Sequence, residues 1–135
     1  MNAVFLDTVG LLALWNRSDQ WHESAEAAFQ SLLARRSLLL TTSLVLLECG
    51  NAAARHQFRQ QVCDLRDVLR SRGELIEPTD ADAEVNDAWV AFERGDAGQA
   101  GIVDHISFAV MRRLEISDAF TNDRHYRAAG MNPLF

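Results

Sequence analysis

Short apolar runs alternate with longer amphipathic segments along the chain. Residues 2–7 and 37–42 are runs of the kind found in buried strands, and residues 74–78 form a third predicted strand that Pro78 ends. A fourth strand is expected at 118–123, and the last residues, 132–135, are a candidate edge strand. Between the strands, apolar residues recur at helical spacing. The predicted helices cover residues 8–16, 20–36, 44–57, 57–72, 80–95, 102–116 and 124–130.

This order of elements predicts the fold class. Strands that are separated by helices pair in parallel through right-handed crossovers, which place helices on both faces of the sheet. The length of 135 residues is that of one domain, and the sequence contains no repeat, linker or low-complexity tract. We therefore expect a single α/β domain over residues 1–135, with a central parallel sheet of four to five strands.

The composition narrows the chemistry. All thirteen basic residues are arginine, so mechanisms that need a lysine, such as the P-loop or a Schiff base, are excluded. The net charge of −6 argues against a broad basic surface for nucleic acid, although an enzyme can reach phosphates through bound cations. No run approaches the roughly 20 apolar residues of a membrane span, and residues 1–15 lack the basic start of a signal peptide. We expect a cytoplasmic protein in which Cys49 and Cys63 are buried free thiols.

Two acidic residues follow predicted strands. Asp7 ends the first strand and Asp123 ends the fourth. In an open parallel sheet, ligands bind outside the carboxyl ends of the strands, at the point where the strand order reverses. These two strands are neighbours if the chain reverses direction across the sheet, and the two carboxylates then lie together.

Two further acids begin apolar helices near the same edge. Glu48 lies in "SLVLLECGNA" and Asp104 in "GIVDHISFAVM". Each has a structural alternative, because an acid in the first turn of a helix is stabilised by the helix dipole. Four carboxylates held together without a counter-charge would repel one another, and no arginine is adjacent in sequence to Asp7, Glu48 or Asp104. The simplest neutraliser is one or two Mg²⁺ or Mn²⁺ ions, and the lack of a His or Cys pattern argues against zinc.

Four segments resemble, in order, the signature segments of PIN-domain ribonucleases, most closely the VapC-like toxins of bacterial toxin–antitoxin pairs. They are "FLDTVGLLAL", "TTSLVLLECGNA", "GIVDHISFAVMRRLEI" and "AFTNDRHYRAAG". The resemblance implies a three-layer α/β/α sandwich and Mg²⁺- or Mn²⁺-dependent hydrolysis of RNA phosphodiester bonds. It also implies a homodimer that a cognate antitoxin protein inhibits.

The resemblance assigns roles to individual residues. The acidic quartet of the family carries over onto Asp7, Glu48, Asp104 and Asp123, as metal ligands and catalytic residues. Glu48 is either a ligand or the group that orients the attacking water.

Other positions near the quartet are expected to assist it. The small polar helpers of the family carry over onto Thr8 and Thr121. The sequence departs from the family pattern in "GQAGIVD", which lacks the usual serine, and at Asn122, where an apolar or aromatic residue is usual; Asn122 could add a hydrogen-bonding group at the mouth of the site. Arg124 and Arg127 are candidate RNA contacts.

Two other classes of function deserve comparison. A phosphatase of the haloacid-dehalogenase kind also has an aspartate after its first strand, but it needs a second aspartate at the position of Val9 and a lysine. A non-catalytic module that uses the same fold to bind a partner would be favoured if one quartet acid were missing, and none is.

Overall fold

The computed structural model describes residues 2–135, and its strands are shorter than the apolar runs that predict them. All pair in parallel. The five strands are β1 (Ala3–Leu6), β2 (Leu38–Thr42), β3 (Leu75–Ile76), β4 (Asp118–Phe120) and β5 (Asn132–Pro133).

Seven helices connect them, in the order that the sequence predicts. They are α1 (Thr8–Trp15), α2 (His22–Ala34), α3 (Ser43–Ala53), α4 (Arg59–Ser71), α5 (Ala83–Arg94), α6 (Ile102–Arg113) and α7 (Arg124–Ala128). Two helix starts differ from the predicted ranges. α3 begins at Ser43 instead of residue 44, after Thr42, whose hydroxyl caps the helix, and α5 begins at Ala83 instead of residue 80.

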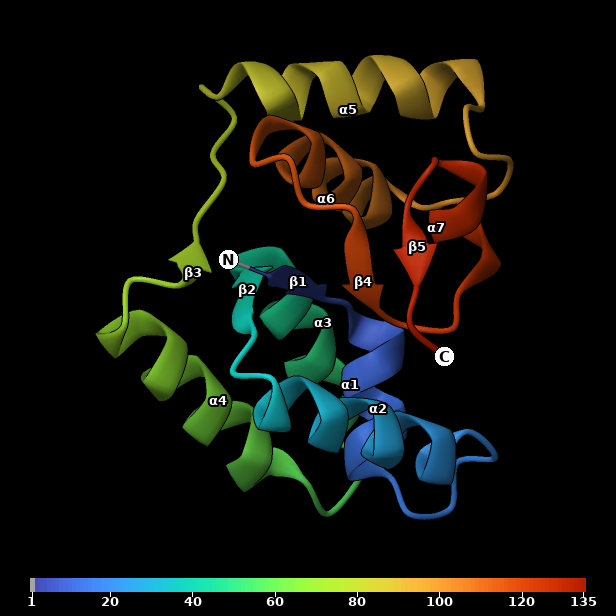
Figure 1. Ribbon diagram of the computed structural model, residues 1–135. Helices are drawn as coiled ribbons and strands as arrows, with labels where there is room; N and C mark the ends of the chain where they lie inside the picture. Colours follow the sequence, from blue (N-terminus) through green and yellow to red (C-terminus); the bar gives the residue numbers. More distant parts are fainter. Residues whose placement is uncertain (1) are drawn as a thin grey trace.

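The strand order in the sheet is β3-β2-β1-β4-β5. The chain moves outward from β1 to β3 and then returns to place β4 on the other side of β1, with Phe5 opposite Ala119. The predicted reversal of strand order therefore lies between β1 and β4. Figure 1 shows α5 and α6 on one side of the strands and α1 to α4 on the other, which is the predicted three-layer α/β/α arrangement.

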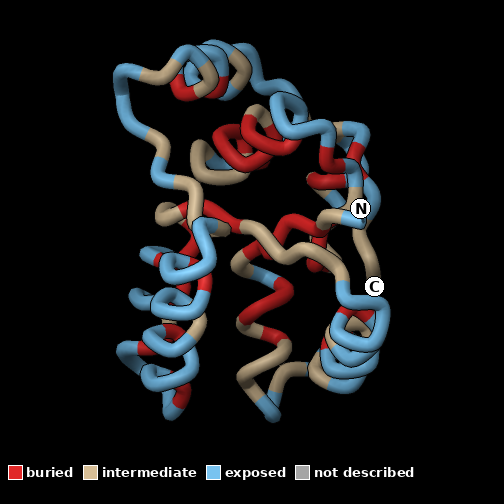
Figure 2. Tube along the Cα trace, turned by 60° about the vertical axis from the view of Figure 1, so that its left-hand side comes forward, coloured by how far each residue is buried: buried red, intermediate tan, exposed pale blue. Residues whose placement is uncertain are grey.

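The core fills the space between the sheet and both helix layers. Val4, Phe5 and Leu6 of β1 are fully buried, as is Phe120 of β4. Figure 2 shows buried residues along the strands and the inner helix faces, whereas the outer faces are exposed. Cys49 lies in this core, but Cys63 is exposed on α4, so the prediction of two buried thiols was wrong for Cys63.

A glycine sets the distance between α1 and β4. A Cβ atom at Gly10 would lie 2.0 Å from the carbonyl oxygen of Phe120, which is far inside van der Waals contact. Any side chain there would push the helix away from the strand. Gly10 therefore allows the first turn of α1 to lie directly against the end of β4.

The sheet ends in very short strands on both sides. β3 and β5 have two residues each, and β5 contains Pro133, whose backbone has no N–H to donate.

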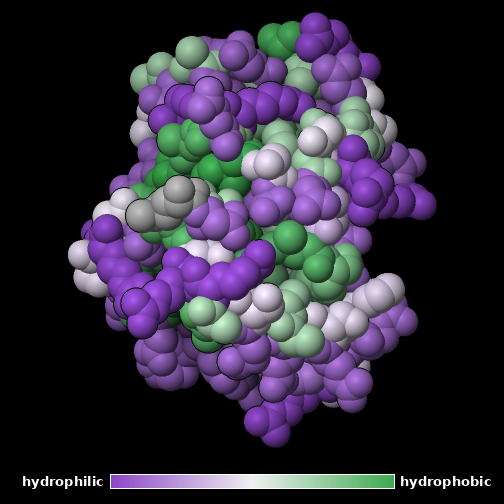
Figure 3. Space-filling model, in the orientation of Figure 1, coloured by the Kyte–Doolittle hydropathy of each residue, from purple (hydrophilic) through white to green (hydrophobic). Residues whose placement is uncertain are grey.

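The face of the molecule in Figure 3 is mostly hydrophilic, with smaller hydrophobic areas among the hydrophilic ones. None of the helices within residues 2–135 is both long enough and apolar enough to cross a bilayer.

Candidate active site

Asp7 is the most enclosed of the predicted acids. It follows β1 directly, caps the N-terminus of α1 by accepting a hydrogen bond from the Val9 N–H at 3.3 Å, and is only 2% exposed. Two side-chain hydroxyls also donate to its carboxylate: Tyr126 Oη to Oδ1 at 2.7 Å and Thr121 Oγ1 to Oδ2 at 2.8 Å. The buried carboxylate is therefore fully hydrogen-bonded, which offsets much of the cost of burying it.

Thr121 connects the first and the last acid. Its hydroxyl donates to Asp7 and accepts a hydrogen bond from the Asp123 backbone N–H at 3.0 Å. Asp123 caps α7, and its Oδ1 accepts from the His125 N–H and lies 2.7 Å from His125 Nδ1. The loop after β4 thus holds two predicted acids through one threonine.

The other two acids lie on helices that start at the same edge. Asp104 is in the first turn of α6, where its Oδ2 accepts a hydrogen bond from the Gly101 N–H at 3.3 Å. Glu48, on the exposed side of α3, accepts one from Thr8 Oγ1 at 2.6 Å. Both predicted threonines, Thr8 and Thr121, therefore contact predicted acids, whereas Asn122 makes no side-chain hydrogen bond to any residue within 2–135.

The four carboxylates lie within electrostatic range of one another. Burial raises the pKa of Asp7 to about 7, and the charges of Asp104 and Asp123 act in the same direction against the hydrogen bonds of Tyr126 and Thr121. Burial likewise raises the pKa of Asp104 to about 6; the Gly101 N–H opposes this, while the charges of Asp123 and Glu48 add to it. A cation at this edge would relieve both effects.

Cys49 and Tyr126 are buried close enough to the acids for the Asp7 charge to affect the pKa of both. Burial raises the pKa of the Cys49 thiol to about 12, with the charges of Asp7 and Glu48 acting in the same direction. Burial and the adjacent Asp7 carboxylate hold the pKa of Tyr126 well above its usual range. Both groups therefore stay protonated at neutral pH.

The donor chemistry fits a hard divalent cation, but the side chains do not form a closed cage. Carboxylate oxygens are the ligands that Mg²⁺ and Mn²⁺ prefer, and no arginine within residues 2–135 forms an ion pair with any of the four acids. Over the same residues, no three His, Cys, Asp or Glu side chains are arranged to hold a metal ion. Each of the four carboxylates instead accepts at least one hydrogen bond from a neighbouring group of the described chain.

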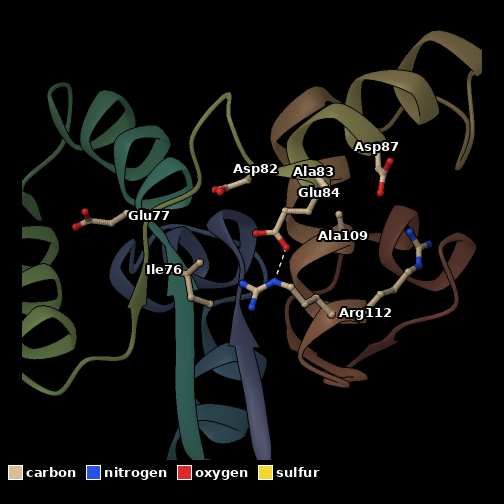
Figure 4. Close-up of a pocket in the computed structure, with 9 residues that line it drawn as sticks. Ile76, Glu77, Asp82, Ala83, Glu84, Asp87, Ala109 and Arg112 are labelled. Atoms are coloured by element: carbon tan, nitrogen blue, oxygen red, sulfur yellow. Dashed lines mark hydrogen bonds and ion pairs between the residues drawn. The ribbon is translucent and has the colours of Figure 1, made fainter.

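Two arginines border the acidic edge. Arg124 and Arg127 of α7 are exposed, and neither pairs with an acid elsewhere in the described chain. Together with His125 and the 97–99 loop they line a surface hollow of about 810 Å³. A second hollow of about 790 Å³ lies between β3, α5 and α6 and is crossed by the Arg113–Glu84 ion pair (Figure 4). None of the four acids lines either hollow.

Tyr126 is the residue that sequence reasoning missed. It lies in the quoted segment "RHYR", three residues after Asp123, where helical spacing turns it back toward the core. Tyr126 is the only tyrosine in the sequence, and it lies among charged residues just after Asp123. These two facts could have marked it as a candidate for the site. They did not reveal its partner, because Asp7 lies 119 residues away in the sequence.

Known proteins share this fold and sequence. The 23S rRNA-specific endonuclease VapC20 of Mycobacterium tuberculosis, recorded from two strains, is 32% identical over 132 residues, with 94% of each chain covered. A crystal structure of M. tuberculosis VapC20, described as a sarcin–ricin loop cleaving toxin, superposes with a TM-score of 0.74 at 26% identity and covers 96% of each chain. FitAcB from Neisseria gonorrhoeae superposes with a TM-score of 0.63 at 16% identity, over 98% of this chain and 96% of that one, which concerns the fold alone. No family model matches the sequence.

The strand order, the acids at its reversal point and these superpositions together define an α/β/α domain of the PIN type. At the sequence identity and coverage found with VapC20, the chain belongs to the VapC-like family of PIN-domain toxins. The predicted family and fold are thereby confirmed.

Proposed function

We propose that this chain is a divalent-metal-dependent endoribonuclease and the toxin of a type II toxin–antitoxin pair. The observation that carries the proposal is the set of four carboxylates at the point where the strand order reverses, with no arginine paired to them within residues 2–135. Membership of a family that includes an rRNA endonuclease supports the same activity.

Asp7, Asp104 and Asp123 would hold one or two Mg²⁺ or Mn²⁺ ions, and Glu48 would be a further ligand or would orient the attacking water. A bound ion of this kind polarises a phosphate and lowers the pKa of a bound water. The chain's own contribution is to hold the carboxylates: Thr121 fixes Asp7 relative to Asp123, and Thr8 holds Glu48 beside the first turn of α1. Asn122 would add a hydrogen-bonding group at the mouth of the site.

The substrate we propose is ribosomal RNA, by analogy with VapC20, whose name specifies 23S rRNA. Arg124 and Arg127 would contact its phosphates, since their guanidinium groups are exposed and unpaired within the described chain. Two arginines on one short helix would thus bind phosphates even though the net charge of the chain is −6.

The proposed partners are a cognate antitoxin and a second copy of this chain, in the cytoplasm. An antitoxin arginine that reaches the carboxylates would compete with the metal for their charge. For the homodimer, α5 offers the rings of Trp89 and Phe92, which meet edge to face and are 50% and 45% exposed. Exposed apolar side chains that lie together are a feature of protein contacts.

The first test uses an RNA stem–loop that carries the sarcin–ricin sequence, with purified protein free of antitoxin. We expect cleavage with Mg²⁺ or Mn²⁺, no cleavage with EDTA, and none with Asp104→Asn. Thermal unfolding with Mn²⁺ accompanies it: at 100 times the dissociation constant the ion should stabilise the protein by about 2.7 kcal/mol, or several degrees in Tm. The Asp104→Asn protein should lose most of that rise.

Asp118→Asn is the matched control. Asp118 begins β4 at the opposite edge of the sheet, where it accepts a hydrogen bond from Asn132, so its loss should change neither cleavage nor the Mn²⁺ effect. If Mn²⁺ raises the Tm of neither the wild-type nor the Asp118→Asn protein, the metal site is refuted. A non-catalytic PIN-fold module that binds a partner would then explain the chain better.

A further inference from the structure

The phenol of Tyr126 contacts the Asp7 carboxylate from inside the core. Tyr126 is on α7, is fully buried, and donates a 2.7 Å hydrogen bond to Asp7 Oδ1. Asp7 itself is on the other side of the reversal point, after β1. This hydrogen bond therefore joins the two halves of the site.

The Asp7 carboxylate is held at both oxygens. Tyr126 donates to Oδ1 and Thr121 donates to Oδ2, so the carboxylate group cannot rotate about its bond to Cβ without breaking a hydrogen bond. A carboxylate oxygen has two lone pairs. Oδ2 accepts both the Thr121 hydroxyl and the Val9 N–H, whereas Oδ1 accepts the Tyr126 hydroxyl alone and keeps one lone pair for a cation. The Tyr126 phenol thus fixes the direction of that remaining lone pair.

The ring of Tyr126 is itself fixed by packing. It meets the ring of Phe108 on α6 edge to face, with centroids 4.8 Å apart and planes at 85°. Phe108 is 1% exposed and lies one turn after Asp104. The ring contact therefore fixes the phenol against α6, the helix that also carries Asp104.

We propose that Tyr126 is a positioning residue that orients the Asp7 carboxylate and so raises the affinity of the site for a divalent cation. The inference rests on the proposed function, because it requires that Asp7 binds a metal ion. Groups that hydrogen-bond to metal-ligating side chains typically contribute 10- to 100-fold in metal affinity or activity. A phenol in this position also satisfies the buried carboxylate without admitting water.

The decisive variant is Tyr126→Phe, which keeps the ring and its packing on Phe108 and removes one oxygen atom. We expect the Mn²⁺ dissociation constant, measured by calorimetry without RNA, to rise 10- to 100-fold. The matched control is Thr41→Val, since Thr41 is also fully buried and its hydroxyl donates a 2.6 Å hydrogen bond to the Leu6 carbonyl. It removes a buried hydroxyl beside β1 without touching an acid, so its Mn²⁺ affinity should equal that of the wild type.

A second measurement needs no variant. Tyr126 is the only tyrosine, so protein labelled with ¹³C at the tyrosine Cζ gives one signal from this phenol. Titration with Mg²⁺ should shift that signal with the same dissociation constant that calorimetry gives for Mg²⁺. No shift at saturating Mg²⁺ would overturn the proposal even if Tyr126→Phe failed to fold.

The outcomes separate this inference from the proposed function. If the wild type binds Mn²⁺ and Tyr126→Phe binds it within twofold of that affinity, the positioning role is refuted and the metal site stands. An equal loss of affinity in Thr41→Val would also refute it, because general loosening of the core would then explain both. If the wild type binds no Mn²⁺, the proposed function itself fails.

Discussion

Asp7 combines two demands that normally conflict. It is almost fully buried, yet its proposed role requires a negative charge. Three donors, the Val9 N–H and the hydroxyls of Thr121 and Tyr126, favour the charged form, whereas burial and the neighbouring acids favour the protonated form and hold the pKa at about 7. If Asp7 holds a cation, as proposed, binding of the ion near neutral pH would release a proton from this carboxylate.

This balance predicts the pH dependence of stability in the metal-free protein. The pKa of Asp7 is about 7 in the folded state against 3.8 ordinarily, so the folded state binds the proton more tightly. The stability from this group is fully present below about pH 4 and is lost as the pH rises through 7. We expect the Tm in EDTA to fall by several degrees between pH 5 and pH 8.

The variant Asp7→Asn should show a flatter profile over the same range, with the remaining slope due partly to Asp104, whose pKa is about 6. In saturating Mn²⁺ the wild-type trend should reverse, because deprotonated carboxylates bind the ion better at higher pH. Equal slopes of Tm against pH for wild type and Asp7→Asn in EDTA would show that Asp7 does not cause the pH dependence.

At this scale the sequence predicts the acids but not their partners. Asp7, Glu48, Asp104 and Asp123 stand out because each is an acid in apolar sequence next to a strand or at a helix start. The hydrogen bond of Tyr126 to Asp7 joins residues that are 119 positions apart, and no local pattern encodes how α7 lies relative to the end of β1. The roles of the four acids as metal ligands stay predictions.

At the scale of elements, the order was predictable and the ends were not. Helical periodicity and short apolar runs predicted the succession of strands and helices, because these patterns span many residues. The fourth strand was expected to reach 123 but ends at Phe120, since Thr121 uses its hydroxyl to accept the Asp123 N–H in a turn. The third strand has two residues instead of five, because it pairs with only one neighbour and is flanked by glutamates.

The close approach of α1 to β4 makes Gly10 a sensitive position. Gly10→Ala places a methyl group where only 2.0 Å separates it from the Phe120 carbonyl oxygen, so helix and strand must move apart. We expect a loss of about 1–3 kcal/mol in the free energy of unfolding, measured by urea denaturation. Weaker Mn²⁺ binding should accompany it, because Asp7 caps the same helix.

Gly50→Ala is the matched control. Gly50 is also within a helix, and a Cβ there meets nothing within 4 Å. Alanine should raise stability at this site by up to about 1 kcal/mol, because it is the better helix former. Equal effects of the two substitutions would show that the α1–β4 contact imposes no constraint.

For the whole molecule, the distribution of charge matters more than its sum. The net charge is −6, yet Arg124 and Arg127 lie exposed beside the acidic edge. Replacing both with glutamine should weaken RNA binding and lower the slope of log K against log salt concentration by up to about 2, since the two proposed phosphate contacts would be lost. Binding of the Asp104→Asn protein to labelled stem–loop RNA at several salt concentrations measures this without cleavage.

The control for this experiment changes the net charge equally. Arg36 and Arg72 precede β2 and β3, so they lie at the opposite edge of the parallel sheet. Their replacement by glutamine should leave the slope within error of the parent. A similar loss in both double variants would mean that long-range attraction, rather than local contact, drives the binding.

The two-residue strands at the sides of the sheet have a consequence for self-association. A sheet with long open sides can recruit identical chains and grow into aggregates, and natural proteins avoid this with short outer strands and proline. Here each side offers only two residues of backbone, and on one side Pro133 removes a donor. Both outer strands therefore offer little backbone for fibrillar stacking, and we expect the proposed dimer to form through side chains on the helices instead.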